Sequence, residues 1–299
     1  MLKIRIVVIC LFTAFVFFSS CNSKKEDHTP AHIVIVVEEN HGYSQIINSE
    51  NAPFINQLAK EGLLFTNSQG VTHPSQPNYL ALFSGSLQGT DGDECLDKKS
   101  PLTTPNLGAA LLQNGYNFIG YSEGLPNTGS LVCDSEVSKG YDYARKHAPW
   151  VNWQGGQLQK NGLPDSTNQP LSYFPSDFNK LPTLSFVIPN EGNDMHNIDI
   201  DGDTAAIKRA DQWLKDHLSS YIEWAKKNNS IFILTFDEDD GGSMIHNHIP
   251  TLFVGDKIRH GTDSAAINHY SVLRTIESMY NLPLSGKANG TKLIEGIWK

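Results

Sequence analysis

A run of β-branched residues near the start of the chain constrains the fold most. The segment His32-Ile33-Val34-Ile35-Val36-Val37 is apolar after its first residue, which is typical of a strand buried on both faces of a parallel sheet. The run ends abruptly in Glu38-Glu39-Asn40, and residues 52–62 then show helical spacing and a terminal glycine. A strand followed by a helix is therefore the first unit that the sequence predicts.

The same alternation of apolar runs and amphipathic segments continues to the end of the chain. It predicts further helices at residues 107–115, 205–227 and 270–280, and further strands at residues 116–121, 184–188, 231–235 and 249–254. Alternation of this kind favours an α/β fold in which helices cover both faces of a mostly parallel central sheet. We expect a single folded domain over residues 31–299.

The N-terminal residues are typical of an exported protein. Lys3 and Arg5 precede an apolar run that is too short to span a bilayer, so residues 1–20 are expected to be a signal peptide. The sequence Phe18-Ser19-Ser20-Cys21 resembles a lipoprotein cleavage site, which would place a lipid on Cys21. Residues 21–30 are polar and are expected to form a tether. We expect a protein anchored by lipid to the cell envelope, or a secreted one if Cys21 is not lipidated.

The net charge limits the classes of partner that the sequence allows. The formal net charge is -9 and no basic patch is visible, so a nucleic-acid partner is not expected. Membrane contact is expected only through the lipid anchor, and the sequence does not fix the oligomeric state.

Outside the N-terminal segment the cysteines are Cys95 and Cys133, which an oxidising compartment would join in a disulfide. Two free thiols are the alternative.

Polar residues cluster where predicted strands end. Glu39-Asn40 follows the first strand, residues 190–196 (NEGNDMH) follow the strand that ends at Ile188, and residues 237–240 follow the strand that ends at Thr235. Ligands of open parallel sheets bind at the carboxyl ends of the strands. These distant clusters are therefore expected to converge on one site. The polar segment 150–177 is long enough to border or roof it.

Ser75 lies at the start of a segment that is compatible with a helix. Residues 72–79 (THPSQPNY) precede the apolar run 80–83. Serine in this position is most often a helix cap. The positive end of a helix also favours an anion such as phosphate, which a hydroxyl placed there would be able to attack. The local sequence alone favours the cap.

Five motifs together resemble a known family. Glu39-Asn40, residues 72–79, residues 190–196, Phe236-Asp237-Glu238 and residues 268–271 (NHYS) are similar, in this order, to the phosphoesterase family of bacterial acid phosphatases and phospholipases C. That family belongs to the alkaline phosphatase superfamily. The resemblance covers residues 32–282 and implies an alkaline phosphatase-like fold and hydrolysis of phosphate esters.

The resemblance also implies roles for individual residues. Ser75 matches the nucleophile, which would form a phosphoserine intermediate. The matches to metal ligands are Glu39, Asn40, Asp237 and Glu238, and those to residues near the phosphate are His73, Asn78 and His147. A second metal or further phosphate contacts are implied for Asp194, His196 and His248. A bound cation would supply the activation that a serine hydroxyl lacks near neutral pH.

The identity of the metal stays open in this interpretation. The oxygen ligands suit Mg, Ca or Mn, whereas the set of Asp194, His196 and His248 suits Zn. Each motif alone also has a plain structural interpretation. An isolated acidic run such as 237–240 is more often a solvated turn, and histidines such as His41 are often structural.

The sequence therefore predicts a metal-dependent phosphomonoesterase of the acid phosphatase type. A phospholipase C or another phosphodiesterase is the alternative within the same family. A non-catalytic surface binding lipoprotein is the alternative from another class, because a fold does not by itself fix a function.

Overall fold

The computed structural model describes residues 28–96, 101–155, 160–241 and 247–299. The expected signal peptide, the expected lipid site Cys21 and most of the expected tether lie outside the described residues. Within these four ranges, no helix combines the length and the apolar character that crossing a bilayer requires.

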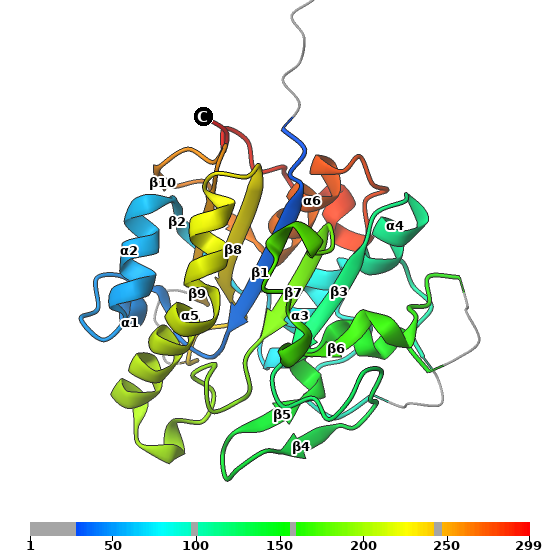
Figure 1. Ribbon diagram of the computed structural model, residues 1–299, viewed down its shortest axis with the longest axis horizontal. Helices are drawn as coiled ribbons and strands as arrows, with labels where there is room; N and C mark the ends of the chain where they lie inside the picture. Colours follow the sequence, from blue (N-terminus) through cyan, green and yellow to red (C-terminus); the bar gives the residue numbers. More distant parts are fainter. Residues whose placement is uncertain (1–27, 97–100, 156–159, 242–246) are drawn as a thin grey trace, which may run out of the picture.

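A mixed sheet forms the centre of the described protein (Figure 1). Its order is β10-β2-β9-β8-β1-β7-β3-β6, with β11 paired to β2. The strand β9 runs antiparallel to both of its neighbours, and the other pairings are parallel. The nine strands are β1 (His32–Glu38), β2 (Leu63–Gln69), β3 (Phe118–Ser122), β6 (Asn168–Pro170), β7 (Leu184–Ile188), β8 (Ser230–Phe236), β9 (His248–Gly255), β10 (Gly261–Asp263) and β11 (Ile267–Asn268).

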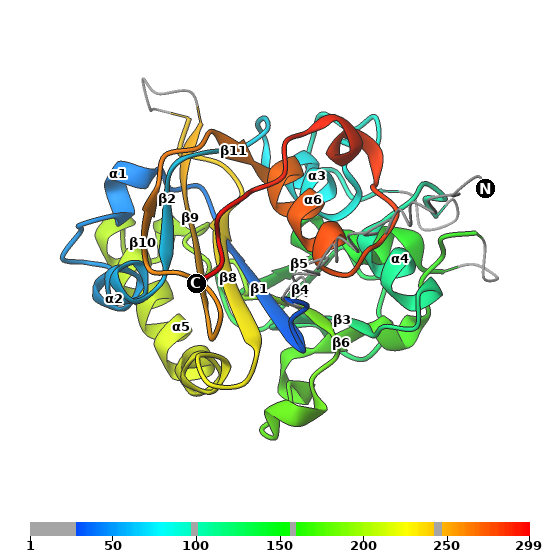
Figure 2. The ribbon, with the colours of Figure 1, turned by 90° about the horizontal axis from the view of Figure 1, so that it is seen from above.

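Helices cover both faces of this sheet (Figure 2). One face carries α2 and α5, and the other carries α3, α4 and α6. A separate hairpin of β4 (Asp134–Glu136) and β5 (Asp142–Ala144) lies beyond the carboxyl ends of the strands (Figure 1). The helices are α1 (Tyr43–Ile46), α2 (Pro53–Glu61), α3 (Ser75–Ser84), α4 (Leu107–Gln113), α5 (Asp203–Ala225) and α6 (His269–Met279).

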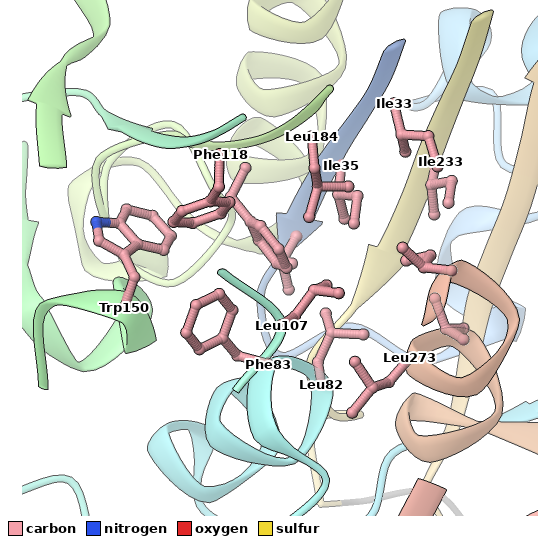
Figure 3. Packing of buried hydrophobic residues seen from close by; sticks show 14 of the residues in the cluster. Ile33, Ile35, Leu82, Phe83, Leu107, Phe118, Trp150, Leu184, Ile233 and Leu273 are labelled. Carbon is pink, nitrogen blue, oxygen red and sulfur yellow. The ribbon is translucent and has the colours of Figure 1, made fainter. Parts of the chain in front are cut away.

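The strand β1 divides its side chains between the two helical layers. Ile33, Ile35 and Val37 pack in the core beneath α3, α4 and α6, and Val34 and Val36 pack beneath α2 and α5. Figure 3 shows Ile33 and Ile35 in the first of these cores. Burial on both faces explains why this strand is a continuous apolar run rather than an alternating one.

The register of β1 against β8 positions the two main acidic segments. Val37 pairs with Thr235 and Glu38 pairs with Phe236, so the chain leaves both strands at the same level. The residues that follow, Glu39 and Asp237, therefore emerge side by side. The expected convergence of distant strand ends is present in the fold.

The helix α3 is buried along its whole length, since each of its ten residues is buried. Its cap residue is Pro74, and Ser75 is the first residue inside the helix. The interpretation of Ser75 as a helix cap is therefore wrong. Burial on all sides places both ends of this helix under tight positional control.

Two features of the fold differ from the expectations. The described parts of the segment 150–177, residues 150–155 and 160–177, do not form a roof: Trp150 packs in the core against Gly120 and Phe186, and Asn168–Pro170 forms the edge strand β6. The sequence also did not predict β2, because only the first three residues of Leu63–Gln69 are apolar.

Candidate active site

Ser75 and Glu39 form the centre of a buried polar cluster. Ser75 is 2% exposed, and its hydroxyl donates a hydrogen bond to Glu39 Oε2 at 3.0 Å. Glu39 Oε1 accepts a hydrogen bond of 2.6 Å from the hydroxyl of Tyr79. Ser75 and Tyr79 are four residues apart on α3, so they share one face of the helix. Both oxygens of Glu39 are thus directed at α3.

His147 lies between two of the predicted acidic residues. It is in the short 3-10 helix η1 (Arg145–His147), with Nε2 at 3.1 Å from Glu39 Oε1 and Nδ1 at 3.3 Å from Asp194 Oδ2. These are ion-pair distances without the alignment of a hydrogen bond. Burial lowers the pKa of His147, but Glu39 and Asp194 raise it more, so the net pKa lies above the ordinary value. The ring is therefore suited to carry positive charge.

Asp237 and Glu238 follow β8 and complete the acidic group. Asp237 Oδ1 accepts hydrogen bonds from the backbone N–H of Asn40 at 3.0 Å and of Glu238 at 2.6 Å. Asn40 has a left-handed backbone with φ of 53°, which asparagine tolerates better than most residues and which directs its N–H at Asp237. The turn after β1 is thereby joined to the end of β8.

Two residues that the sequence predicts near a phosphate contact Glu238. Asn78 Nδ2 donates to Glu238 Oε2 at 3.0 Å, and its Oδ1 accepts from the N–H groups of Val71 and Thr72. His73 Nδ1 lies 3.1 Å from Glu238 Oε2, and His73 Nε2 lies 3.3 Å from Asp239 Oδ1. The amide of Asn78 is occupied within the protein, whereas the ring of His73 is 44% exposed.

A lysine that the sequence analysis did not select contributes the main positive charge. Lys146 Nζ lies 2.9 Å from His196 Nε2, 3.4 Å from Glu191 Oε1 and 3.6 Å from Asp93 Oδ2. Burial lowers the pKa of Lys146, but Glu39, Glu191 and Asp93 raise it more, so the amine stays charged. Asp93 also accepts a hydrogen bond of 2.9 Å from the N–H of Gln76, the second residue of α3.

The carboxylates raise one another's pKa. Burial, Glu39 and Glu238 hold the pKa of Asp237 well above its usual range, and burial, Glu39 and Asp93 raise that of Glu238 to about 8. Burial raises the pKa of Glu39 as well, but His147, His196 and Lys146 lower it more, and its net pKa lies below the ordinary value. Buried carboxylates that repel one another form an environment in which a cation is strongly favoured.

Two observations indicate that the residues of the site are suited to hold a divalent cation. Asp237 Oδ2 is buried and has no hydrogen-bond partner among the described residues. Ligand atoms of Glu39, His147 and His196 also lie within 4.8 Å of one another. Glu39 thus belongs to an oxygen-rich set with Asn40, Asp237 and Glu238 on one side, and to a set with two imidazoles on the other.

His248 is not brought into this cluster. Its ring stacks on Tyr43 at 4.5 Å, and its Nε2 lies 3.1 Å from the carbonyl oxygen of Thr66. Among the described residues, its ring thus contacts other parts of the protein. His41 is a structural histidine as expected: it is buried, with Nδ1 at 2.9 Å from the Glu39 carbonyl oxygen and Nε2 at 3.0 Å from Asp203.

The expected disulfide between Cys95 and Cys133 is present. It connects the loop that carries Asp93 to the segment that leads into η1. The carbonyl oxygen of Cys133 accepts a hydrogen bond of 2.8 Å from the N–H of Arg145, and Arg145 immediately precedes Lys146. The disulfide therefore helps to position the cationic side of the site.

A cavity of about 360 Å³ lies beside the cluster. Its lining includes Asn40, His73, His196, Ile198 and Glu238. Another cavity, of about 570 Å³, lies next to Thr29 and Trp298, and none of the predicted site residues lines it. Of these two cavities, the smaller is therefore the one that borders the polar cluster.

Comparison with known proteins identifies the family of this chain. The model of the Phosphoesterase family matches residues 46–283. The chain belongs to this family. Glu39 and Asn40 lie shortly before the matched residues, and the fold brings Glu39 to Ser75 and Asn40 to Asp237.

Two similar proteins with assigned activities indicate the class of reaction. The chain is 47% identical over 272 residues to a phosphatidylinositol-3-phosphatase of Mycobacterium tuberculosis, covering 90% of this chain and 83% of that protein. It is 30% identical over 266 residues to an acid phosphatase of Aspergillus fumigatus, covering 86% of this chain but only 56% of the fungal protein. The enzyme is thus a hydrolase that acts on phosphoric ester bonds.

A solved structure shows the same fold. A protein of the alkaline phosphatase superfamily from Vibrio parahaemolyticus matches with a TM-score of 0.60 and 16% identity, over 89% of this chain and 71% of that one. The alkaline phosphatase-like fold that the motifs imply is therefore confirmed.

Proposed function

We propose that this enzyme hydrolyses phosphate monoesters through a phosphoserine intermediate on Ser75. The observation that carries the proposal is the hydrogen bond of 3.0 Å from the buried Ser75 hydroxyl to Glu39 Oε2. A serine that serves only the helix accepts a hydrogen bond from the backbone of the first turn. Ser75 instead donates to a carboxylate at the carboxyl end of β1, in the arrangement expected of an activated nucleophile.

The chemistry requires two displacements at phosphorus. In the first, Ser75 Oγ forms a bond to phosphorus while the bond to the leaving oxygen breaks; the hydroxyl proton passes to Glu39 Oε2, its existing acceptor, and the leaving oxygen takes a proton from solvent and departs as an alcohol. In the second, water attacks phosphorus, the Oγ–P bond breaks, and Oγ regains its proton from Glu39. The attacking water releases one proton to solvent and keeps the other as it becomes part of the phosphate. Both steps spread negative charge over the outer phosphoryl oxygens.

The positively charged groups of the site are placed to stabilise this negative charge. Lys146 and His147 lie near Glu39, and their positive charges would stabilise the phosphoryl oxygens. His196 Nε2 accepts a hydrogen bond of 2.9 Å from Lys146 Nζ and so helps to position that amine. Asp194 lies on the far side of His147 and orients its ring, with Oδ2 at 3.3 Å from Nδ1. Asn78 acts through Glu238, which it holds in place by a hydrogen bond of 3.0 Å.

We further propose a divalent cation held by Glu39. Its partners are Asn40, Asp237 and Glu238 if the ion is Mg, Ca or Mn, and His147 and His196 if it is Zn. Such a cation lowers the pKa of a nearby hydroxyl and offsets the charge of the phosphoryl group. The unpartnered Asp237 Oδ2 supports the oxygen-rich set.

The relatives support a monoester over a diester as substrate. The M. tuberculosis protein is named a phosphatidylinositol-3-phosphatase and the A. fumigatus protein an acid phosphatase, and both names denote phosphatases. A phosphodiesterase of the phospholipase C type is the alternative. A non-catalytic binding protein has little support, because Ser75 and its acidic partners are in place and in contact.

The test compares p-nitrophenyl phosphate with bis(p-nitrophenyl) phosphate, with and without chelator. We expect the monoester to be turned over faster, activity to be lost with chelator, and divalent cations to restore it. The variant Ser75→Ala should lose at least about a thousandfold in kcat. Ser84→Ala, which removes another buried hydroxyl of α3, is the matched control and should keep its activity. Unchanged activity of Ser75→Ala would refute the mechanism.

A further inference from the structure

Tyr79 is buried between the proposed base and the proposed cationic imidazole. It is 1% exposed and lies one helical turn after Ser75 on α3. Its hydroxyl donates to Glu39 Oε1 at 2.6 Å. Its ring stacks on His147, with the ring centres 5.0 Å apart and the ring planes inclined by 16°. One side chain thus contacts two residues to which the mechanism assigns separate tasks.

The two oxygens of Glu39 have different partners. Oε2 accepts the hydrogen bond of Ser75 at 3.0 Å, and Oε1 accepts that of Tyr79. His147 Nε2 also lies 3.1 Å from Oε1, but it lacks the alignment of a hydrogen bond. Within the described part of the chain, Tyr79 therefore supplies the aligned donor to Oε1. Two donors from one face of one helix favour the orientation of the carboxylate in which Oε2 faces Ser75.

The Tyr79 hydroxyl keeps its proton and its place. Burial and the carboxylates of Glu39, Asp237 and Asp194 hold the pKa of Tyr79 well above its usual range, so the phenol remains a donor at neutral pH. All ten residues of α3 are buried, and a closely packed helix of this kind resists displacement. The hydroxyl is therefore a fixed support for Glu39 and does not itself transfer a proton.

The orientation of Glu39 matters for both displacements at phosphorus. Glu39 Oε2 takes the proton of Ser75 in the first step and returns it in the second, and each transfer requires a distance of about 2.6–3.2 Å. Without the Tyr79 hydroxyl, the charge of His147 would attract either oxygen of Glu39, and the carboxylate would be free to turn away from Ser75. A misplacement of about 1 Å can lower a rate about a hundredfold.

We propose that Tyr79 is a positioning residue, which acts through Glu39 by holding its carboxylate in the orientation that receives the Ser75 proton. This inference rests on the proposed phosphoserine mechanism. It also has a rival with the opposite sign. A donor to a carboxylate makes that carboxylate a weaker base, so removal of the donor would by itself speed the proton transfer. Positioning predicts that the reaction becomes slower.

The test uses Tyr79→Phe, which removes the hydroxyl and keeps the ring against His147. Release of p-nitrophenol from p-nitrophenyl phosphate is followed in single turnovers, with enzyme in excess and divalent cation present. We expect the maximal rate constant to fall at least about tenfold, and the enzyme concentration that gives half of that maximum to change less than about threefold. Unfolded enzyme would alter the concentration that is needed and leave the maximal rate constant unchanged.

The matched control is Tyr221→Phe. Tyr221 of α5 is also fully buried, and its hydroxyl donates to the carbonyl oxygen of Ile231 at 2.9 Å, away from the site. Both variants lose one buried hydrogen bond, so both should show a Tm lower by about 2–4 °C. The maximal rate constant of Tyr221→Phe should stay within about twofold of wild type.

Three results would overturn the inference. A maximal rate constant of Tyr79→Phe that is higher than wild type, or less than about threefold lower, shows that the hydroxyl does not position Glu39. An equal loss in Tyr221→Phe shows that the effect is not specific to the site. In both cases an inactive Ser75→Ala leaves the proposed function standing. An active Ser75→Ala overturns the inference and the proposed function together.

Discussion

Removal of the disulfide between Cys95 and Cys133 should weaken both the fold and the cationic side of the site. The two cysteines are 38 residues apart in sequence, and closing a loop of this length restricts the unfolded chain by about 4 kcal/mol. For a folded domain of this size, that loss corresponds to a fall in Tm of about 7 °C. The double variant Cys95→Ser/Cys133→Ser tests this by thermal unfolding followed by circular dichroism.

The same variant should lose phosphatase activity at temperatures where it is still folded. The disulfide connects the loop of Asp93 to the segment that carries Lys146, and these side chains are 3.6 Å apart. Added reductant should shift the wild-type Tm toward that of the variant and leave the variant unchanged. A fall in Tm of less than about 2 °C, or a wild-type Tm that does not respond to reductant, would refute the reasoning.

Three further predictions concern the core, the pH dependence of stability and the N-terminal segment. Gly120→Ala should lower the unfolding free energy by about 1–3 kcal/mol, because a Cβ at this position would lie 2.1 Å from Trp150. Denaturant titration measures this loss. The control Gly290→Ala, whose added Cβ meets no atom within 4 Å, should leave the unfolding free energy unchanged. Burial raises the pKa of Glu277 to about 7 from its ordinary 4.5, so the folded state loses stability as pH rises through that interval. Glu277→Gln should remove this loss and gain up to about 3 kcal/mol over wild type between pH 5 and pH 8; equal pH dependence of the two proteins would contradict it. Cys21→Ser should move the protein from the membrane fraction to the soluble fraction of its host, and an unchanged distribution would count against a lipid anchor.

The sequence predicts the framework of this fold well because burial leaves a clear pattern. The run at β1 is apolar throughout since both of its faces are covered, and the helices α2, α4, α5 and α6 lie at or near their expected positions. Strand direction leaves no such pattern, so the antiparallel pairing of β9 with its neighbours was not predictable. The short strands β10 and β11 carry too few residues for any periodicity.

Some residues of the site could also be predicted from the sequence, and others could not. Glu39 and Asp237 were predictable because each follows a buried strand, and the pairing of Glu38 with Phe236 brings them together. Tyr79 had a usable signal, since it lies four residues after Ser75 on a predicted helix. Asp93 had none, because only the tertiary fold brings its loop to the start of α3.

His248 lies away from the residues with which the family resemblance groups it. That resemblance implies a second metal or further phosphate contacts for Asp194, His196 and His248. In the fold His248 begins β9 and pairs with Gln69 of β2, and its ring stacks on Tyr43. The second imidazole beside Glu39 is His147, which comes from η1 and not from a strand end.

The most direct test of the central claim is to locate the phosphoryl group during turnover. Wild-type enzyme is mixed rapidly with a phosphomonoester, quenched in acid, digested and analysed by mass spectrometry, with Ser75→Ala treated in parallel. We predict a phosphoryl group on Ser75 of the wild-type enzyme, formed at least as fast as turnover, and none on the variant. Turnover with no phosphorylated Ser75, or with the phosphoryl group on another residue, would contradict the account.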